Sequence, residues 1–531
     1  MTTKKQDHKL FFICLSLFFL MNNLSFSQQL NYTLNRDFLW GFDNYYNNKE
    51  QNTQTFVKPY RFSELKQITD STASFPRLLA GTKAEEHDKT HKNLIEVFPL
   101  LTAQTGYESG TSSRLTHDLA IGGTLIASFG DKFALNFKAL AGKGTYTSYM
   151  DSIIKQTHMI PGIGYAYLSK KDSLNPQYAY QYFTGYASYS PNKIFNFQAG
   201  QDKHFWGDGY RSLFLSDVAA PYPFLKITTN VWHLTYVNLY TIMRDATNPS
   251  GFKKDWLNKY ATFHYLGWNA TKRINIGLFE SIVWQGTDST RYRGYDVNYL
   301  NPVMFFRPTE YSLGSSDNAF VGMSLKIKLF KKQQLYGQLL LDEFLLKEIL
   351  AQKGWWGNKQ AFQLGLKSFD LFRVSKLNFQ TEFNYVRPYT YSHASVQQNY
   401  GHMNQPLADP LGANFMESAT FINYRHHRLF FEAKCTYAIY GGDSATTDYG
   451  KNIYISYTNR PAEYGNFTGQ GFQTRLITAS LRGAYVLDTH MNLKIELGFA
   501  DRIITSTYSK KQTPYIFFGI KTDLSNLYED Y

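Results

Sequence analysis

The chain has 531 residues, a formal net charge of +13 and 17% aromatic residues, with 41 tyrosines and 42 phenylalanines. Its mean hydropathy of −0.38 argues against a protein made of several membrane-spanning helices. The basic excess would suit contact with anionic glycans or lipid headgroups, but at this size it favours an ordinary solvated surface. No phosphate-binding loop motif occurs, and we expect neither a cofactor nor a nucleic-acid partner.

The N-terminus has the pattern of an export signal. Three lysines within the first nine residues precede the apolar stretch LFFICLSLFFLM at residues 10–21. Ser25 and Ser27 supply the small residues that a signal peptidase requires, so cleavage is expected before Gln28. We therefore predict that residues 1–27 are a signal peptide of a Gram-negative exported protein.

Residues 28–92 lack the pattern of the rest of the chain. In the sequence RFSELKQITDSTASFP, Ser63 precedes an amphipathic turn and Pro76 would break a helix. We predict a short mixed or helical N-terminal segment here, which is either periplasmic or a plug.

From residue 93 onward, apolar and polar residues alternate with a period of two, which predicts strands with one apolar and one polar face. One such segment alternates Leu493, Ile495, Leu497 and Phe499 with Lys494 and Glu496. The polar face carries charges of both signs elsewhere too: Lys326, Lys328, Glu382, Glu432 and Lys434. These charges could pair across an interior and fill it, or line a wet channel.

The spacing of the segments predicts eighteen strands, an even number. Predicted strands start near residues 94, 117, 132, 179, 194, 223, 234, 259, 273, 318, 333, 359, 375, 414, 429, 472, 490 and 513. Short connections alternate with long ones along the chain, just as short periplasmic turns alternate with long extracellular loops in outer-membrane barrels. We predict an all-β fold, in which residues 93–531 form a transmembrane antiparallel β-barrel integral to the outer membrane and surrounded by its lipid.

The stretch GQDKHFWGDGYRSLFLSD, residues 200–217, is predicted to be a long connection at the outer end of a strand. Trp206 and Tyr210 could stack on sugar rings, while Asp208 and Arg211 could bind hydroxyl groups. The alternative is a loop folded into the pore, as barrels commonly have. We interpret the stretch as an exposed, glycan-binding rim.

Two further loops supply candidate glycan-binding residues. Arg307, Glu310 and Tyr311 lie in one long connection, where Arg307 and Glu310 could instead form a buried ion pair that anchors the loop. Trp355 and Trp356 lie in another. We expect these aromatic and charged side chains to contact a polysaccharide.

Catalytic patterns are weak. His393 and Ser395 have the spacing of an outer-membrane phospholipase pair, but they lie in a loop. Asp342 and Glu343 are adjacent in a predicted strand, where they would point to opposite faces and could not act together. The adjacent histidines at 426–427 would diverge, so we predict no metal site.

Four segments resemble the Wzi-like capsule assembly family, and more closely a member involved in gliding motility. They are GQDKHFWGDGYRSLFLSDVAAPYPFLKI at 200–227, NPVMFFRPTEYSLGSSDNAFVG at 301–322, YGQLLLDEF at 336–344 and NQPLADPLGANF at 404–415. The resemblance implies an eighteen-stranded outer-membrane barrel with helical material on the periplasmic side. It also implies attachment of surface polysaccharide, or a cell-surface role in gliding.

Together these features predict a non-enzymatic outer-membrane barrel that binds or anchors surface or capsular polysaccharide and supports capsule assembly, gliding motility or adhesion. Other proteins of the surface machinery would be further partners. One alternative is a porin-like or polysaccharide-export channel. A second is an outer-membrane enzyme that acts on lipid or glycan.

Overall fold

The structure is a computed structural model of the chain. It describes residues 29–48, 53–64, 93–110, 113–172, 175–247, 253–287, 292–303, 317–489, 491–507, 509–522 and 525–531. No helix in these ranges has the length and apolar character needed to cross a membrane. The predicted signal peptide lies outside the described residues.

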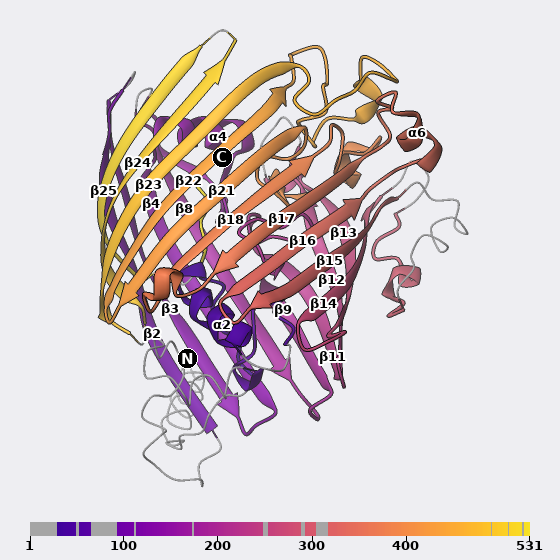
Figure 1. Ribbon diagram of the computed structural model, residues 1–531. Helices are drawn as coiled ribbons and strands as arrows, with labels where there is room; N and C mark the ends of the chain where they lie inside the picture. Colours follow the sequence, from indigo (N-terminus) through magenta and orange to yellow (C-terminus); the bar gives the residue numbers. More distant parts are fainter. Residues whose placement is uncertain are drawn as a thin grey trace, which may run out of the picture.

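Eighteen antiparallel strands form one closed barrel, in which the last strand pairs with the first (Figure 1). The predicted fold class and strand number are confirmed, and each predicted strand start lies within three residues of the observed one. The barrel strands are β2 (Asn93–Glu108), β3 (Arg114–Phe129), β4 (Phe133–Thr145), β8 (Gln177–Tyr189), β9 (Phe195–Asp202), β11 (Tyr222–Val231), β12 (Leu234–Asp245), β13 (Leu257–Trp268), β14 (Ile274–Gln285), β15 (Asn318–Phe330), β16 (Gln333–Leu341), β17 (Gln360–Ser368), β18 (Leu377–Val386), β21 (Phe415–His426), β22 (Leu429–Gly442), β23 (Phe472–Asp488), β24 (Leu493–Ser506) and β25 (Lys510–Thr522).

Shorter elements lie in the connections and in the N-terminal segment. The short strands are β1 (Val57–Lys58), β5 (Met159–Ile160), β6 (Gly164–Tyr165), β7 (Tyr167–Lys170), β10 (Phe205–Trp206), β19 (Gly401–His402) and β20 (Gln405–Pro406). The α-helices are α2 (Arg36–Asn48), α4 (Ser148–Thr157) and α6 (Leu346–Ala351). The 3-10 helices are η1 (Lys253–Asp255), η2 (Val297–Leu300), η3 (Leu371–Arg373), η4 (Val396–Gln398) and η5 (Tyr457–Asn459).

The two ends of the barrel differ in the length of their connections. At the end that we call the turn end, eight short turns join successive strands. Gly130 and Trp232 adopt positive φ angles of 59° and 53° in two of these turns, which suits a tight hairpin. The other end, the loop end, carries the predicted long connections, although residues 109–113 and 507–509 form short ones there as well.

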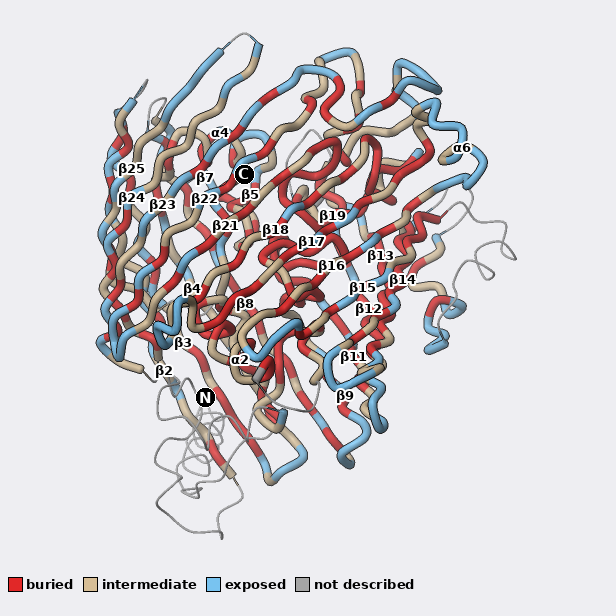
Figure 2. Tube along the Cα trace, viewed as in Figure 1, coloured by how far each residue is buried: buried red, intermediate tan, exposed pale blue. Residues whose placement is uncertain are grey.

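The predicted inward and outward faces of the strands are also correct. On β24, Lys494 and Glu496 are buried, whereas Leu497 and Phe499 are 56% and 44% exposed on the outside. Buried and exposed residues alternate in the same way along many barrel strands (Figure 2). A closed wall leaves no strand edge unpaired, and an apolar exterior suits the hydrocarbon of a bilayer. The architecture is that of an integral outer-membrane barrel.

Helix α2 lies inside the barrel, within the segment 28–92 that was predicted to be mixed or helical, although its position in that segment was not predicted (Figure 1). Its residues Phe38, Phe42 and Tyr46 are buried at intervals of four, which is the spacing of one helix face. Helices had instead been predicted in the stretch that follows Ser63, most of which falls outside the described residues.

Charged side chains on the inner wall contact this N-terminal segment. Lys367 of β17 pairs with Asp43 at 2.5 Å, and Arg482 of β23 pairs with Asp37 at 2.7 Å. Four of the predicted luminal charges have partners in the same segment: Lys494 with Asp37 at 3.2 Å, Glu432 with Arg36 at 2.9 Å, Lys328 with the Tyr46 carbonyl at 2.6 Å and Lys326 with the Thr53 carbonyl at 2.7 Å. Of the two arrangements considered for these charges, the structure shows the one in which they pair within the interior.

Candidate functional site

The stretch Gly200–Asp217 begins in the wall, where β9 ends at Asp202, and then lies inside the barrel and not on an exposed rim. Strand β10 of this stretch pairs with β1 of the N-terminal segment. Trp206 is 0% exposed, and its ring lies 6.1 Å from the rings of Phe263 and Phe279 on the inner wall. The prediction of an exposed rim is therefore wrong. The reason is that the apolar run SLFLSDVAAPYPF, residues 212–224, gains more from burial in the lumen than from exposure at the loop end.

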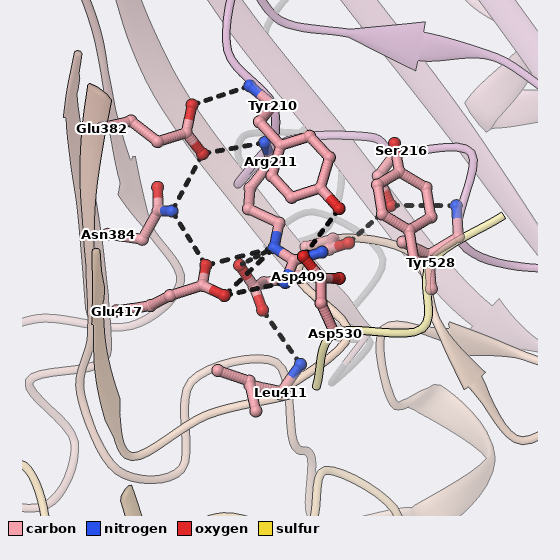
Figure 3. A network of polar contacts seen from close by, with 12 residues as sticks. Tyr210, Arg211, Ser216, Glu382, Asn384, Asp409, Leu411, Glu417, Tyr528 and Asp530 are labelled. Atoms are coloured by element: carbon pink, nitrogen blue, oxygen red, sulfur yellow. Dashed lines mark hydrogen bonds and ion pairs between the residues drawn. The ribbon is translucent and has the colours of Figure 1, made fainter. Parts of the chain in front are cut away.

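Arg211 is the centre of a buried ionic network (Figure 3). The guanidinium is 1% exposed and donates to both oxygens of Glu417 on β21, at 2.8–3.3 Å. It also pairs with Asp530 at 3.2 Å and lies 3.8 Å from Asp409. One cation therefore joins the barrel wall, the connection before β21 and the last residues of the chain.

Glu382 holds the backbone of the same loop. Its carboxylate accepts the N–H groups of Tyr210 and Arg211 at 2.7 and 2.9 Å, as Figure 3 shows. The Tyr210 hydroxyl donates to Asp530 at 2.8 Å, and the Tyr528 hydroxyl donates to Asp217 at 2.7 Å. Residues 525–531 thus return from the end of β25 into the barrel and are bonded to the loop.

The pKa values of two carboxyl groups beside Arg211 are shifted in opposite directions. Burial opposes the ionisation of Asp530, but Arg211 and Lys434 outweigh it and hold the Asp530 pKa below its usual range. Burial raises the pKa of Asp409 well above its usual range, and the neighbouring Glu417 raises it further. The raised pKa favours the neutral form of Asp409, which limits the negative charge enclosed with one arginine.

Asp208 has partners in the N-terminal segment. Thr55 donates its hydroxyl to Asp208 at 2.5 Å. Burial opposes ionisation, but Lys326 and Lys58 lower the Asp208 pKa below its usual value. The side chains of Trp206, Asp208, Tyr210 and Arg211 are thus engaged inside the barrel, and they offer no exposed surface to a polysaccharide at the loop end. Arg307, Glu310 and Tyr311 lie outside the described residues.

Trp355 and Trp356 lie at the loop end and are half-buried. Trp356 donates its indole N–H to Glu463 at 2.8 Å, and the Arg460 guanidinium lies 4.0 Å from the centre of the Trp356 ring. Tyr457 packs against the same ring at 4.7 Å. We call this cluster the loop platform, and we include in it two neighbouring exposed aromatic residues: Trp355, Trp356, Tyr457, Arg460, Glu463, Tyr464 and Phe467.

Two connections pair through their backbones to build the loop platform. The Gly465 and Asn466 N–H groups donate to the Lys353 and Gly354 carbonyls, both at 2.9 Å. Gly354 adopts a φ of 66°, and a Cβ there would lie 2.8 Å from the Asn466 carbonyl oxygen. Only glycine permits this close approach. The platform is therefore a defined surface in which Tyr464 and Phe467 remain 49% and 62% exposed.

A cavity of about 340 Å³ lies between the inner wall and the C-terminal residues. Its lining includes Asp118, Tyr180, Tyr515, Lys521 and Glu529. The Tyr180 hydroxyl donates to Asp118 at 2.8 Å. The cavity is lined by both polar and apolar side chains and is of a size that holds water or a small molecule.

No protein-family model matches the sequence, and no curated protein does. Among solved structures, the chain is similar to Wzi of Escherichia coli, described as a carbohydrate-binding β-barrel of the outer membrane involved in group 1 capsule assembly. The TM-score is 0.56 at 12% identity, and the match covers 95% of this chain and 100% of Wzi. The chain has the fold of Wzi. At this identity the likeness establishes the fold alone.

Two other solved structures match less well. OprD of Pseudomonas aeruginosa matches with a TM-score of 0.41 at 9% identity, over 80% of this chain and 94% of OprD. OccAB2 of Acinetobacter baumannii matches with a TM-score of 0.41 at 10% identity, over 80% of this chain and 98% of that chain.

The catalytic patterns in the sequence do not form catalytic geometry. Ser395 donates its hydroxyl to Gln285 at 2.7 Å, while His393 Nδ1 accepts the Ser395 backbone N–H at 3.3 Å. Strand β16 ends at Leu341, so the opposite faces expected for the next two residues do not arise. Instead, Asp342 and Glu343 both pair with Lys359, at 3.0 and 3.3 Å. Within the described ranges, no cluster of three or more His, Cys, Asp or Glu side chains could hold a metal ion.

The residues that contact Arg211 and Trp356 were not predicted from the sequence. Glu417 and Arg211 are 206 residues apart, and nothing local connects them. Tyr457 and Arg460 lie about a hundred residues beyond Trp356. Glu382 alone had a signal, because its place in an alternating strand predicted an inward side chain.

Proposed function

We propose that this chain is an outer-membrane barrel that binds or anchors surface or capsular polysaccharide at its loop end, without catalysing a reaction. The observation that carries the proposal is the division of the molecule into a largely filled interior and an ordered platform. Residues 29–48, 53–64 and 203–221 occupy the lumen, whereas the loop platform presents aromatic rings, a guanidinium and a carboxylate together. That combination suits sugar rings and their hydroxyl groups.

In this proposal residues 1–27 are removed on export, residues 28–92 plug the barrel from the periplasm, and the loop platform is extracellular. The Wzi fold is consistent with a carbohydrate-binding role, because Wzi is itself described as binding carbohydrate. The sequence resemblance to the gliding-motility protein RemB favours a role in capsule assembly, gliding or adhesion, in contact with other surface proteins.

Binding to immobilised surface polysaccharide from the producing bacterium tests the proposal. Trp355→Ala/Trp356→Ala should weaken binding by about tenfold, as expected for lost aromatic stacking. Tyr464→Ala/Phe467→Ala should do the same without disturbing packing, because both side chains are largely exposed. Phe372→Ala, which removes an exposed aromatic at the turn end, is the matched control and should bind normally.

Equal binding by all variants would show that the loop platform is not the polysaccharide-binding site.

In cells, deletion of the gene should impair capsule retention or surface movement. If both remained intact, the proposed function would be wrong.

A channel is the second candidate, because the 340 Å³ cavity shows that the interior is not completely filled. Liposome swelling separates the two functions. The proposal predicts no solute flux with the purified full chain, and flux that depends on solute size would favour a porin-like or export channel.

A further inference from the structure

The turn end of the barrel carries a large excess of positive charge. Together the eight short turns, residues 130–132, 190–194, 232–233, 269–273, 331–332, 369–376, 427–428 and 489–492, contain two acidic residues, Asp131 and Asp370. They contain nine cationic residues: Lys132, Lys193, Lys272, Arg273, Lys331, Lys332, Arg373, Lys376 and Arg428. We call these turns the basic rim.

Most of the basic rim faces outward from the protein. Seven of the nine cationic residues are exposed, and Lys332 and Lys376 are half-buried. Asp370, one of the two acids, is itself paired with Lys332. The rim therefore presents several guanidinium and ammonium groups to whatever surrounds this end of the barrel.

The loop end shows no such excess. The connections 342–359 and 443–471 together hold six acidic and five cationic residues. Several of these neutralise one another, as Lys359 does with Asp342 and Glu343. The excess of positive charge at the turn end is thus not shared by these two long connections.

Large apolar side chains are interspersed among the rim cations. Trp232, Phe372 and Phe330 are 96%, 85% and 71% exposed. Phe372 adjoins Arg373, and Phe330 adjoins Lys331. Full exposure of such rings to water is unfavourable, whereas the boundary between headgroups and acyl chains accommodates aromatic rings beside cationic groups.

We propose that the basic rim binds the anionic headgroups of the phospholipid leaflet at the turn end, with phosphatidylglycerol-type phosphates as its ligands. Arginine and lysine donate charge-assisted hydrogen bonds to phosphate oxygens, and the rings insert beside them at the top of the acyl chains. The rim is continuous with the apolar belt of the barrel, so the same lipids contact both. This fixes the height and tilt of the barrel in the membrane.

Competition between lipids tests the rim directly. The purified full chain in detergent micelles is mixed with phosphatidylglycerol and phosphatidylcholine of identical acyl chains, and the lipids that it retains are measured by native mass spectrometry. The wild type should retain several-fold more phosphatidylglycerol. The variant Lys272→Gln/Arg273→Gln/Lys331→Gln/Arg373→Gln should retain the two lipids equally.

The matched control is Lys170→Gln/Lys171→Gln/Lys510→Gln/Lys511→Gln, which removes the same charge from exposed positions at the loop end. It should keep the preference. Loss of the preference in this control but not in the rim variant would assign anionic lipid to the loop end and overturn the proposal, as would equal retention by the wild type. If the rim variant does not fold, the double variant Lys272→Gln/Arg273→Gln should still halve the ratio of retained phosphatidylglycerol to phosphatidylcholine. An unchanged ratio in this double variant would refute the proposal. Polysaccharide binding plays no part in these readouts, so the outcome is independent of the proposed function.

Discussion

Replacing Arg211 by methionine should destabilise the interior of the barrel strongly. The guanidinium is 1% exposed, and its partners Glu417 and Asp530 are 1% and 3% exposed. Arg211→Met keeps much of the side-chain volume but leaves two buried carboxylates without their cation. Loss of one partner of a buried ion pair costs about 3–5 kcal/mol.

The contacts that the two carboxylates keep in Arg211→Met show where this loss of stability arises. Asp530 still pairs with Lys434 at 3.1 Å and accepts the Tyr210 hydroxyl, so its charge stays compensated. Glu417 retains Asn384 as a donor at 3.2 Å. Most of the cost therefore falls on Glu417, and neutralising it should recover part of the loss. We expect Arg211→Met/Glu417→Gln to be about 2 kcal/mol more stable than the sum of the single variants predicts.

Denaturant unfolding in detergent micelles, followed by tryptophan fluorescence, measures these differences. Heat-modifiable migration should persist in all three variants, because the hydrogen-bonded wall is untouched. A loss below about 1 kcal/mol in Arg211→Met would be the value of an exposed pair. That result, or strict additivity in the double variant, would refute the buried network.

Three other perturbations test separate parts of the structure. Leu497→Arg should lower the free energy of unfolding in lipid vesicles by about 2–4 kcal/mol, because Leu497 faces outward well inside the apolar belt. Ile495→Arg, close to the start of β24, should lower it less. Equal losses in the two variants would mean that the depth of these residues in the membrane is misassigned. Burial raises the pKa of Asp448 to about 7, so the folded loop keeps a proton that the unfolded chain releases above a pKa of about 4. Stability of this loop, followed by hydrogen exchange, should therefore fall between about pH 4 and pH 7 by up to about 1.4 kcal/mol per unit and then level off. Asp448→Asn should abolish the slope, and a slope that survives would contradict the shift. Trp206→Ala should destabilise the protein by about 3–5 kcal/mol, as a buried tryptophan does, and a neutral effect would favour an exposed loop.

The strands were predictable because a barrel wall imposes its pattern locally. An inward residue such as Glu496 and an outward one such as Leu497 are neighbours in sequence, and many of the barrel strands repeat that alternation. The turns were predictable for a similar reason, since a hairpin of fixed register leaves little choice of length.

The contents of the lumen were not predictable in the same way. Whether residues 200–217 point outward or fold inward depends on Glu382 and Glu417, which the chain supplies nearly two hundred residues later. Helix α2 was hidden because its buried surface includes Asp37 and Asp43, whose charges are acceptable only beside the wall's own cations. From the sequence alone, a charged residue on a helix is predicted to be exposed, because the residue that pairs with it in the folded protein is not known.

The loop platform illustrates the same limit. Trp355 and Trp356 in one loop led to the prediction of a glycan-contacting surface, which stays a prediction. The residues that shape the platform, Arg460 and Glu463, come from another connection and act through the backbone pairing at Gly354.

Cross-linking of helix α2 to the wall tests most directly whether the barrel is filled by its own chain. In a Cys435→Ser background, the pair Asp43→Cys/Lys367→Cys is treated in outer-membrane fractions with a bifunctional thiol reagent of about the length of a lysine side chain. The pair Lys367→Cys/Gln380→Cys, which are opposite one another on β17 and β18, is the positive control. The structure predicts an intramolecular cross-link in both pairs, because Lys367 contacts Asp43 at 2.5 Å. A cross-link in the control pair alone would show that α2 lies outside the lumen and would contradict the account.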